Sequence, residues 1–176
     1  MFVFVLGIPD SGKSALSEKI AMELAGENDK YYIATMIPFG DEGKKRVKKH
    51  RALRAGKGFV TVEEPINPAA AMKRFGNVSG ATCLLECVSN LTGNAMHADT
   101  EGVNALDHVI SEVKELLEIS ENLVAVSNSF PSDDPGYDEE TIKYVKIMDA
   151  VNGKLADMAD TVYRFHKGAW IRVENN

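Results

Sequence analysis

Apolar and polar positions along the chain follow two alternating patterns. One is a short continuous apolar run, typical of a strand buried on both faces, and residues 2–6 (Phe-Val-Phe-Val-Leu) are the clearest example. The other is an apolar stripe at three-and-four spacing, typical of an amphipathic helix, as in Leu16, Ile20 and Leu24. Residues 88–100 are polar and are predicted to form a loop. The patterns predict strands at 2–6, 31–35, 59–62, 81–86, 123–127, 161–165 and 169–173, and helices after residue 13 and at 41–55, 65–75, 103–117 and 142–158.

Strands that alternate with helices predict an α/β fold, with a mostly parallel sheet and helices on both faces. The last two strands, separated by His-Lys-Gly, are predicted to form an antiparallel pair at the C-terminus. In such folds, ligands bind at the carboxyl ends of the strands. We therefore expect residues 7–14, Thr35, Glu86 and residues 127–128 to meet at one edge of the sheet.

The segment between the first strand and the first helix has the spacing of a phosphate-binding loop, which predicts a P-loop NTPase-type fold. Two glycines let the backbone curl until its N–H groups point at a β-phosphate, Lys13 can reach the β- and γ-phosphate oxygens, and the Ser14 hydroxyl can bind Mg²⁺. The positive end of the helix adds to this attraction. The alternative is a glycine turn that binds nothing, but the order of strand, loop and helix favours nucleotide binding. The loop comprises Gly7, Ile8, Pro9, Asp10, Ser11, Gly12, Lys13 and Ser14.

A carboxylate, Glu86, ends the strand predicted over residues 81–86. In P-loop enzymes an acidic residue at the tip of a strand beside the loop holds Mg²⁺ or its water shell. Glu86 is therefore a candidate for a second protein contact to the metal, after Ser14, although it can also be an acid that merely ends a strand. The sequence thus predicts Mg²⁺ as cofactor and GTP or ATP as substrate, without choosing between the two bases.

Composition narrows the class of protein. The 176 residues, 44% of them hydrophobic, fit a single nucleotide-binding domain over residues 1–176. No apolar run approaches a membrane span and no basic leader precedes the first strand, so we expect a cytoplasmic protein without membrane contact. A net charge of −6 argues against nonspecific nucleic-acid binding. Cys83 and Cys87 lie in an apolar segment without the spacing of a zinc site, and we expect reduced core thiols.

The basic residues are unevenly distributed. Eight of the twenty Lys and Arg residues fall within residues 44–57, in the helix predicted over 41–55 and directly after it. In an acidic protein such a cluster indicates either a solvated helix face or a site where a polyanion binds.

Several segments, taken together and in order, resemble the bifunctional adenosylcobinamide kinase/adenosylcobinamide-phosphate guanylyltransferases of cobalamin assembly. The likeness covers almost the whole chain, and its specificity comes from the joint order, since most of the pieces are individually weak. The matching pieces are residues 7–14, 32–35 (Tyr-Ile-Ala-Thr), the helix with Asp41, Glu42, Arg46, Val47, His50 and Arg54, residues 61–65, residues 84–87 with Asn90 and Asn94, residues 126–128, and the segment from Asn152 to Val162.

The resemblance implies two reactions: phosphorylation of a hydroxyl on adenosylcobinamide, then transfer of GMP from GTP to that phosphate through a guanylylated histidine. The family's histidine falls on His50, which the residues alone would favour as an ordinary surface histidine. A neutral imidazole can attack an α-phosphorus, and surrounding Lys and Arg would disfavour its protonation and stabilise departing pyrophosphate. The resemblance also implies a corrinoid substrate and a homo-oligomer, a trimer with the active site between subunits. The implied site comprises the catalytic residues His50 and Lys13, with nucleotide contacts from residues 7–14, Thr35, Arg51, Arg54, Glu63 and Glu86.

The chain departs from the family pattern at three places. Residues 129–131 read Ser-Phe-Pro where the family usually has Glu-Val-Gly, and residues 144–146 read Tyr-Val-Lys where it has Phe-Arg-Asp. Asp10 stands in the phosphate loop where Arg is common. Two alternatives therefore stay open: a P-loop kinase for another small metabolite, and a nucleotide-binding homologue that has lost catalysis.

Overall fold

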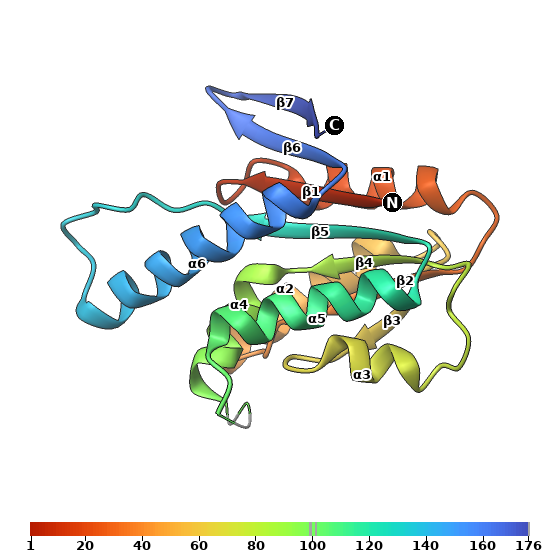
Figure 1. Cartoon of the computed structure of the whole chain (residues 1–176), viewed down its shortest axis with the longest axis horizontal. Helices are drawn as coiled ribbons and strands as arrows, with labels where there is room; N and C mark the ends of the chain where they lie inside the picture. Colours follow the sequence, from red (N-terminus) through yellow and green to blue (C-terminus); the bar gives the residue numbers. More distant parts are fainter. Residues whose placement is uncertain (99, 101, 176) are drawn as a thin grey trace.

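Seven strands form one sheet in the order β3-β2-β4-β5-β1-β6-β7 in the computed structural model, which describes residues 1–98, 100 and 102–175 (Figure 1). Neighbouring strands are parallel from β3 to β6, and only β6 and β7 pair antiparallel. The predicted mostly parallel sheet and the C-terminal antiparallel pair are thus confirmed. The strands are β1 (Phe2–Gly7), β2 (Lys30–Ala34), β3 (Val60–Glu63), β4 (Thr82–Glu86), β5 (Asn122–Asn128), β6 (Thr161–His166) and β7 (Ala169–Glu174).

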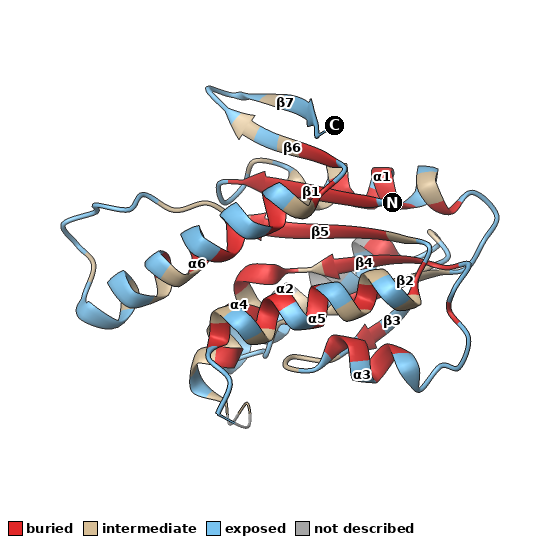
Figure 2. Cartoon of the chain, in the orientation of Figure 1, coloured by how far each residue is buried: buried red, intermediate tan, exposed pale blue. Residues whose placement is uncertain are grey.

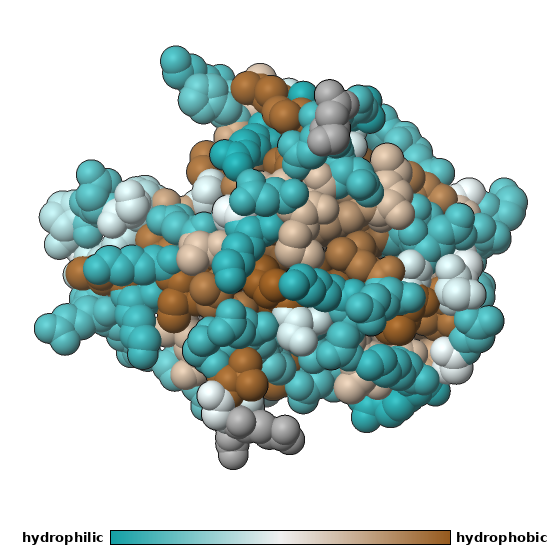
Figure 3. Space-filling view, viewed as in Figure 1, coloured by the Kyte–Doolittle hydropathy of each residue, from teal (hydrophilic) through white to brown (hydrophobic). Residues whose placement is uncertain are grey.

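Helices cover both faces of this sheet. Helices α3, α4, α5 and α6 pack on one face, and α1 and α2 lie on the other, where α2 is drawn behind the sheet in Figure 1. Figure 3, in the same view, shows polar side chains over the outer surfaces of α5 and α6, with apolar ones between the helices. The helices are α1 (Lys13–Ala25), α2 (Gly40–Arg54), α3 (Pro68–Lys73), α4 (Val88–His97), α5 (Ala105–Ile119) and α6 (Glu139–Met158).

The continuous apolar run of β1 exists because this strand is covered on both sides. Its six residues are all buried (Figure 2). Alternate side chains enter two separate cores. Phe2 and Phe4 belong to the core under α3 to α6, whereas Val3 and Val5 belong to the core under α1. Burial on both faces leaves no position where a polar side chain would be solvated, which explains the unbroken pattern.

The prediction of a loop over residues 88–100 is wrong, because residues 88–97 form α4. Several polar groups at and near the start of this helix hydrogen-bond within the fold. The Cys87 sulfur accepts a hydrogen bond from the Asn90 N–H at the start of the helix, and the Thr92 hydroxyl donates to the Val88 carbonyl at 2.9 Å. Leu91 is fully buried, so this helix is held by tertiary packing despite residues of poor helix propensity.

Smaller expectations also change. Helix α2 begins at Gly40, one residue before the predicted start at 41, with Phe39 as its N-cap. Helix α6 begins at Glu139, before the predicted start at 142, and Ile142 in its first turns is 38% exposed. Cys83 and Cys87 are both buried free thiols, as expected. Within the described residues, no helix combines the length and the apolar character that crossing a membrane requires.

Candidate active site at the carboxyl edge of the sheet

The phosphate loop leaves the end of β1 at Gly7 and enters α1 at Lys13. Two of its residues have positive φ angles, 59° at Asp10 and 81° at Gly12, the second of which suits a residue without a Cβ. The Gly7 carbonyl accepts a hydrogen bond of 3.1 Å from the Ser129 N–H, so the segment after β5 lies against the start of the loop. Strand, loop and helix follow in the order that the motif requires.

The serine of the loop and the acid of β4 meet directly. The Ser14 hydroxyl, in the first turn of α1, donates a hydrogen bond of 2.5 Å to Oε1 of Glu86 at the end of β4. β5 lies between β4 and β1, the strand that precedes the loop. The second oxygen of this carboxylate, Oε2, is buried and has no hydrogen-bond partner among the described residues. A buried carboxylate oxygen without a donor is rare, and a cation would satisfy it.

These two residues fit a magnesium ion. A carboxylate and a hydroxyl are the hard oxygen ligands that Mg²⁺ takes, and Mg²⁺ at nucleotide sites is held by one or two protein groups together with phosphate oxygens. No cluster of three or more His, Cys, Asp or Glu side chains suited to a metal occurs in the part of the chain that the structure describes. Ser14 and Glu86 therefore stay the predicted protein contacts to the metal, with the remaining ligands left to phosphate oxygens and water.

Lys13 lies beside this pair at the start of α1. Its Nζ donates a hydrogen bond of 3.1 Å to the Ile8 carbonyl and so spans the loop. Burial lowers the pKa of Lys13, while the neighbouring Cys87, Glu86 and Asp10 act in the opposite direction. An ammonium group that has already lost part of its hydration binds a phosphate at a smaller desolvation cost.

Thr35 sits at the end of β2 and fixes the end of β4. Its side chain is fully buried, and its hydroxyl donates to the Cys87 carbonyl at 2.7 Å and accepts from the Cys87 N–H at 2.8 Å. The Asn94 amide donates to the Thr35 carbonyl at 2.8 Å and to the Pro65 carbonyl at 2.9 Å. Thr35 thus holds the backbone directly after Glu86, and its predicted contact with nucleotide stays a prediction.

Arg51, Arg54 and Glu63 gather on the α2 side of the sheet. The Arg51 guanidinium pairs with the Glu63 carboxylate at the end of β3. The Arg54 guanidinium carbon lies 3.5 Å from the centroid of the Tyr32 ring, and Arg54 is 7% exposed. Burial and the nearby Glu86 carboxylate raise the pKa of Tyr32, so this phenol stays neutral.

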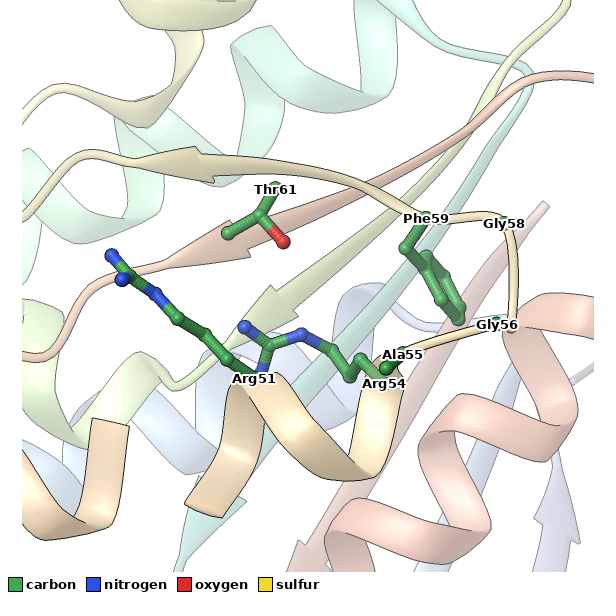
Figure 4. Close-up of a pocket in the computed structure, with 7 residues that line it drawn as sticks. All are labelled: Arg51, Arg54, Ala55, Gly56, Gly58, Phe59 and Thr61. Carbon is green, nitrogen blue, oxygen red and sulfur yellow. The ribbon is translucent and has the colours of Figure 1, made fainter. Parts of the chain in front are cut away.

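An open pocket of about 420 Å³ lies beside these two arginines (Figure 4). The Arg54 side chain extends alongside α2 toward Arg51, Thr61 of β3 lies across from the two arginines, and the Phe59 ring lies at the other end. The Nε atom of Arg54 is buried and lacks a partner within the described residues. The pocket therefore offers positive charge and an aromatic ring to an anionic or planar group. Its lining comprises Arg51, Arg54, Ala55, Gly56, Gly58, Phe59 and Thr61.

His50 belongs to α2, one helical turn before Arg54. Its side chain, with those of Arg46, Lys49 and Leu53, lies outside what the structure describes. The placement of α2 brings this helix to the same face as α1, and the role of His50 stays a prediction.

Sequence reasoning missed a polar network that shapes the segment after β5. The Ser127 hydroxyl donates to Oδ1 of Asn152 at 2.7 Å, and the Asn152 amide donates to the Asn128 carbonyl at 3.0 Å. The Ser89 hydroxyl accepts from the Asn128 N–H at 2.8 Å. The sequence held two separate signals, residues 127–128 at the carboxyl edge of the predicted sheet and the polar Asn152 inside the otherwise apolar stripe of α6, but no pattern that connected them.

Comparison of the sequence with known protein families identifies the family of this chain. The sequence matches the family described as "Cobinamide kinase / cobinamide phosphate guanyltransferase" over residues 3–173, nearly the whole chain. The chain belongs to this cobinamide kinase family. It is thus a transferase of the P-loop class, a kinase and guanylyltransferase by family, as the sequence resemblance implied.

Solved structures support the fold of this family member. It aligns to the ATPase domain of G40P with a TM-score of 0.55 and 14% identity, covering 94% of this chain and 69% of that one. It aligns to an ATPase from the type III secretion system of pathogenic bacteria with a TM-score of 0.56 and 15% identity, covering 94% of this chain and 51% of that one. At such identities the likeness shows the P-loop ATPase fold alone. No curated protein sequence matches the chain.

Two of the segments in which the sequence differs from the family pattern, residues 129–131 and 144–146, lie close together in the structure. Phe130 and Tyr144 stand within the two segments where the family pattern has charged residues, and their rings lie 5.9 Å apart. The Tyr144 hydroxyl donates to the Ser89 carbonyl at 3.0 Å. The family's charged positions fall on the neighbouring Ser129, Val145 and Lys146, whereas Phe130 and Tyr144 stand at its Val and Phe. In this member of the cobinamide kinase family, the aromatic contact thus lies beside the positions at which the charges differ.

Proposed function

We propose that this protein phosphorylates adenosylcobinamide and then transfers GMP from GTP to the resulting phosphate through a guanylylated His50. The observation that carries the nucleotide chemistry is the Ser14–Glu86 contact beside the phosphate loop, with the second Glu86 oxygen buried and unpaired among the described residues. The family match supports the identity of the acceptor.

In the kinase half, the hydroxyl oxygen of the acceptor attacks the γ-phosphorus, and the bond from that phosphorus to the β,γ-bridging oxygen breaks. The nucleoside diphosphate leaves with those electrons, and the hydroxyl proton is released to water. Backbone N–H groups of residues 7–14 and the Lys13 ammonium hold the β- and γ-phosphates in place. Ser14 and Glu86 would hold Mg²⁺, which when bound neutralises charge on the phosphates. Thr35 and Asn94 keep the end of β4, and with it Glu86, in position.

In the transferase half, a neutral His50 nitrogen attacks the α-phosphorus of GTP and pyrophosphate leaves. A phosphate oxygen of adenosylcobinamide phosphate then attacks the same phosphorus, the P–N bond breaks, and the histidine is regenerated. Arg51 and Arg54 line the pocket beside α2 in which we place this GTP, and Glu63 pairs with Arg51. Arginines suit this role because they remain charged and bind phosphate oxygens in a fixed geometry.

Labelling with GTP tests the transferase half. Incubation with [α-³²P]GTP and Mg²⁺ should leave an acid-labile, hydroxylamine-sensitive label on the protein, whereas [γ-³²P]GTP should leave none. His50→Ala should abolish the label. His97→Ala is the matched control, because His97 lies on α4 and pairs with Glu140. An unlabelled wild type, or a labelled His50→Ala protein, would remove this half of the proposal.

A kinase for another small alcohol is the second candidate. It is favoured because Ser129, which stands where the family pattern has Glu, lies against the phosphate loop through its hydrogen bond to the Gly7 carbonyl. Release of ADP or GDP measured with adenosylcobinamide and with a panel of other alcohols separates the two. Turnover with another alcohol, without turnover of adenosylcobinamide and without protein-bound GMP, would support this second candidate. Tight GTP binding with no transfer to any acceptor would instead indicate a homologue without catalysis.

We also propose a homo-oligomer, a trimer by family resemblance. Ile37 and Phe39, directly before α2, are 40% and 80% exposed, and apolar side chains so exposed are typical of an interface. Light scattering after gel filtration measures the molar mass, and Phe39→Ser should shift it toward the monomer. A wild type that is monomeric at the concentration of the activity assay would contradict the proposal.

A further inference from the structure

The hairpin formed by β6 and β7 lies against the phosphate loop, and the mechanism proposed above gives its side chains no role. A Cβ added at Gly7 would lie 2.9 Å from Cη2 of Trp170, a β7 residue that is partly buried, and 3.3 Å from Cβ of Phe165 on β6. The two rings meet edge to face with centroids 5.3 Å apart. The chain has one tryptophan, and it touches the first glycine of the loop.

The hairpin and the metal-binding pair lie on opposite sides of β1. Glu86 is on β4, which is separated from β1 by β5, whereas β6 pairs with β1 on its other side. Because β6 is parallel to β1, its carboxyl end and the turn that follows lie at the same edge of the sheet as the phosphate loop (Figure 1). A triphosphate whose metal-bound end faces Glu86 can therefore direct its other end, with the base, toward the hairpin.

We propose that Trp170, supported by Phe165, forms the stacking wall for the purine base of the phosphate-donor nucleotide in the kinase reaction. The proposal rests on the nucleotide site proposed above. Trp and Phe rings stack on bases through their π-faces, and this contact does not depend on the identity of the base. ATP and GTP should accordingly both serve as phosphate donors.

This wall is distinct from the arginine pocket beside α2. β3 and β7 are the two edge strands, six strand spacings apart, which corresponds to roughly 29 Å at about 4.8 Å each. A base held beside Thr61 of β3 cannot also touch Trp170 of β7. The nucleotide therefore binds the phosphate loop in two orientations. Its base lies toward Trp170 for phosphoryl transfer, and toward Arg54 when His50 attacks the α-phosphorus.

Binding of ATP compared with inorganic tripolyphosphate isolates the contribution of the base. By calorimetry with Mg²⁺, Trp170→Leu should weaken ATP binding by about 5- to 100-fold, as loss of base stacking does, and leave tripolyphosphate binding within about twofold. Trp170→Phe should retain most of the ATP affinity, because it keeps a ring. Phe75→Leu is the matched control, since Phe75 is 49% exposed and pairs with Tyr31 away from the loop.

The outcomes separate this proposal from the one on which it rests. A Trp170→Leu protein that loses ATP and tripolyphosphate affinity equally would show that the ring only supports Gly7 and would overturn the stacking role. Unchanged ATP affinity would overturn it as well. If the wild type binds neither ligand, the proposed nucleotide site itself fails. The rate of labelling by [α-³²P]GTP should fall less in Trp170→Leu than the affinity for ATP does, because the base then faces Arg54. An equal loss of both would contradict the two orientations.

Discussion

Replacing Glu86 by Gln should separate the folding role of this residue from its metal role. The substitution keeps the shape of the side chain and an oxygen that can accept from Ser14, and it removes the negative charge. The Ser14 hydrogen bond, 2.5 Å long in the structure, changes from a charge-assisted bond of about 1.5–3 kcal/mol to a neutral one of about 0.5–1.5 kcal/mol. Removal of a buried charge whose second oxygen has no partner within the described residues offsets much of this loss.

The expected result is therefore a small change in stability and a large change in metal-dependent binding. The free energy of unfolding without ligand should change by less than about 1 kcal/mol. The affinity for Mg²⁺-GTP should fall about 10- to 100-fold, the range for carboxylates that support a bound metal. Urea denaturation measures the first quantity, and calorimetry with Mg²⁺ or with EDTA measures the second.

A matched control comes from the opposite face of the sheet. Glu112 is also a buried carboxylate, and it accepts a hydrogen bond of 2.8 Å from the Ala69 N–H. Glu112→Gln should change stability without changing the Mg²⁺ dependence of GTP binding. If Glu86→Gln binds GTP with the wild-type dependence on Mg²⁺, the assignment of this carboxylate to the metal is refuted.

Three further substitutions or conditions test the site and the core. Gly7→Ala should lower the free energy of unfolding, measured in urea, by about 1–3 kcal/mol, because the new methyl carbon would lie 2.6 Å from the Ser11 hydroxyl oxygen. An unchanged midpoint of the urea transition would contradict that contact. Asn152→Ala should cost a similar amount, about 1–3 kcal/mol, because it leaves the buried Ser127 hydroxyl without its acceptor; Asn152→Asp, which keeps the acceptor oxygen, should cost less. Burial raises the pKa of Cys83 and of Cys87 from 9.0 to about 11. Between these values the folded state binds more protons than the unfolded state. The free energy of unfolding should therefore fall as the pH rises from 9.0 to about 11. Thiol-reagent titration should find both groups unreactive at pH 8 until urea is added, and rapid reaction of the native protein would exclude this burial.

The sequence alone was sufficient for the fold class and for the phosphate loop, because both depend on local patterns. An unbroken apolar run marks β1 and β5, since a strand covered on both faces leaves no position for a polar residue. The loop depends on glycine and lysine at fixed spacing, and this spacing is a property of eight consecutive residues. The position of Glu86 beside the loop could also be predicted, because this residue ends a buried strand and the carboxyl ends of parallel strands lie at one edge of the sheet.

Tertiary structure decided everything that depends on the order of strands and on the partners of polar side chains. Residues 88–97 form a helix because Leu91 is buried and Asn94 binds backbone carbonyls from two distant segments, information that their own composition does not contain. Trp170 lies more than 160 residues after Gly7 and meets it only because β6 inserts beside β1. A local pattern records how a segment is buried; which segments then face each other is set by long-range strand pairing, for which no short stretch of sequence carries a signal.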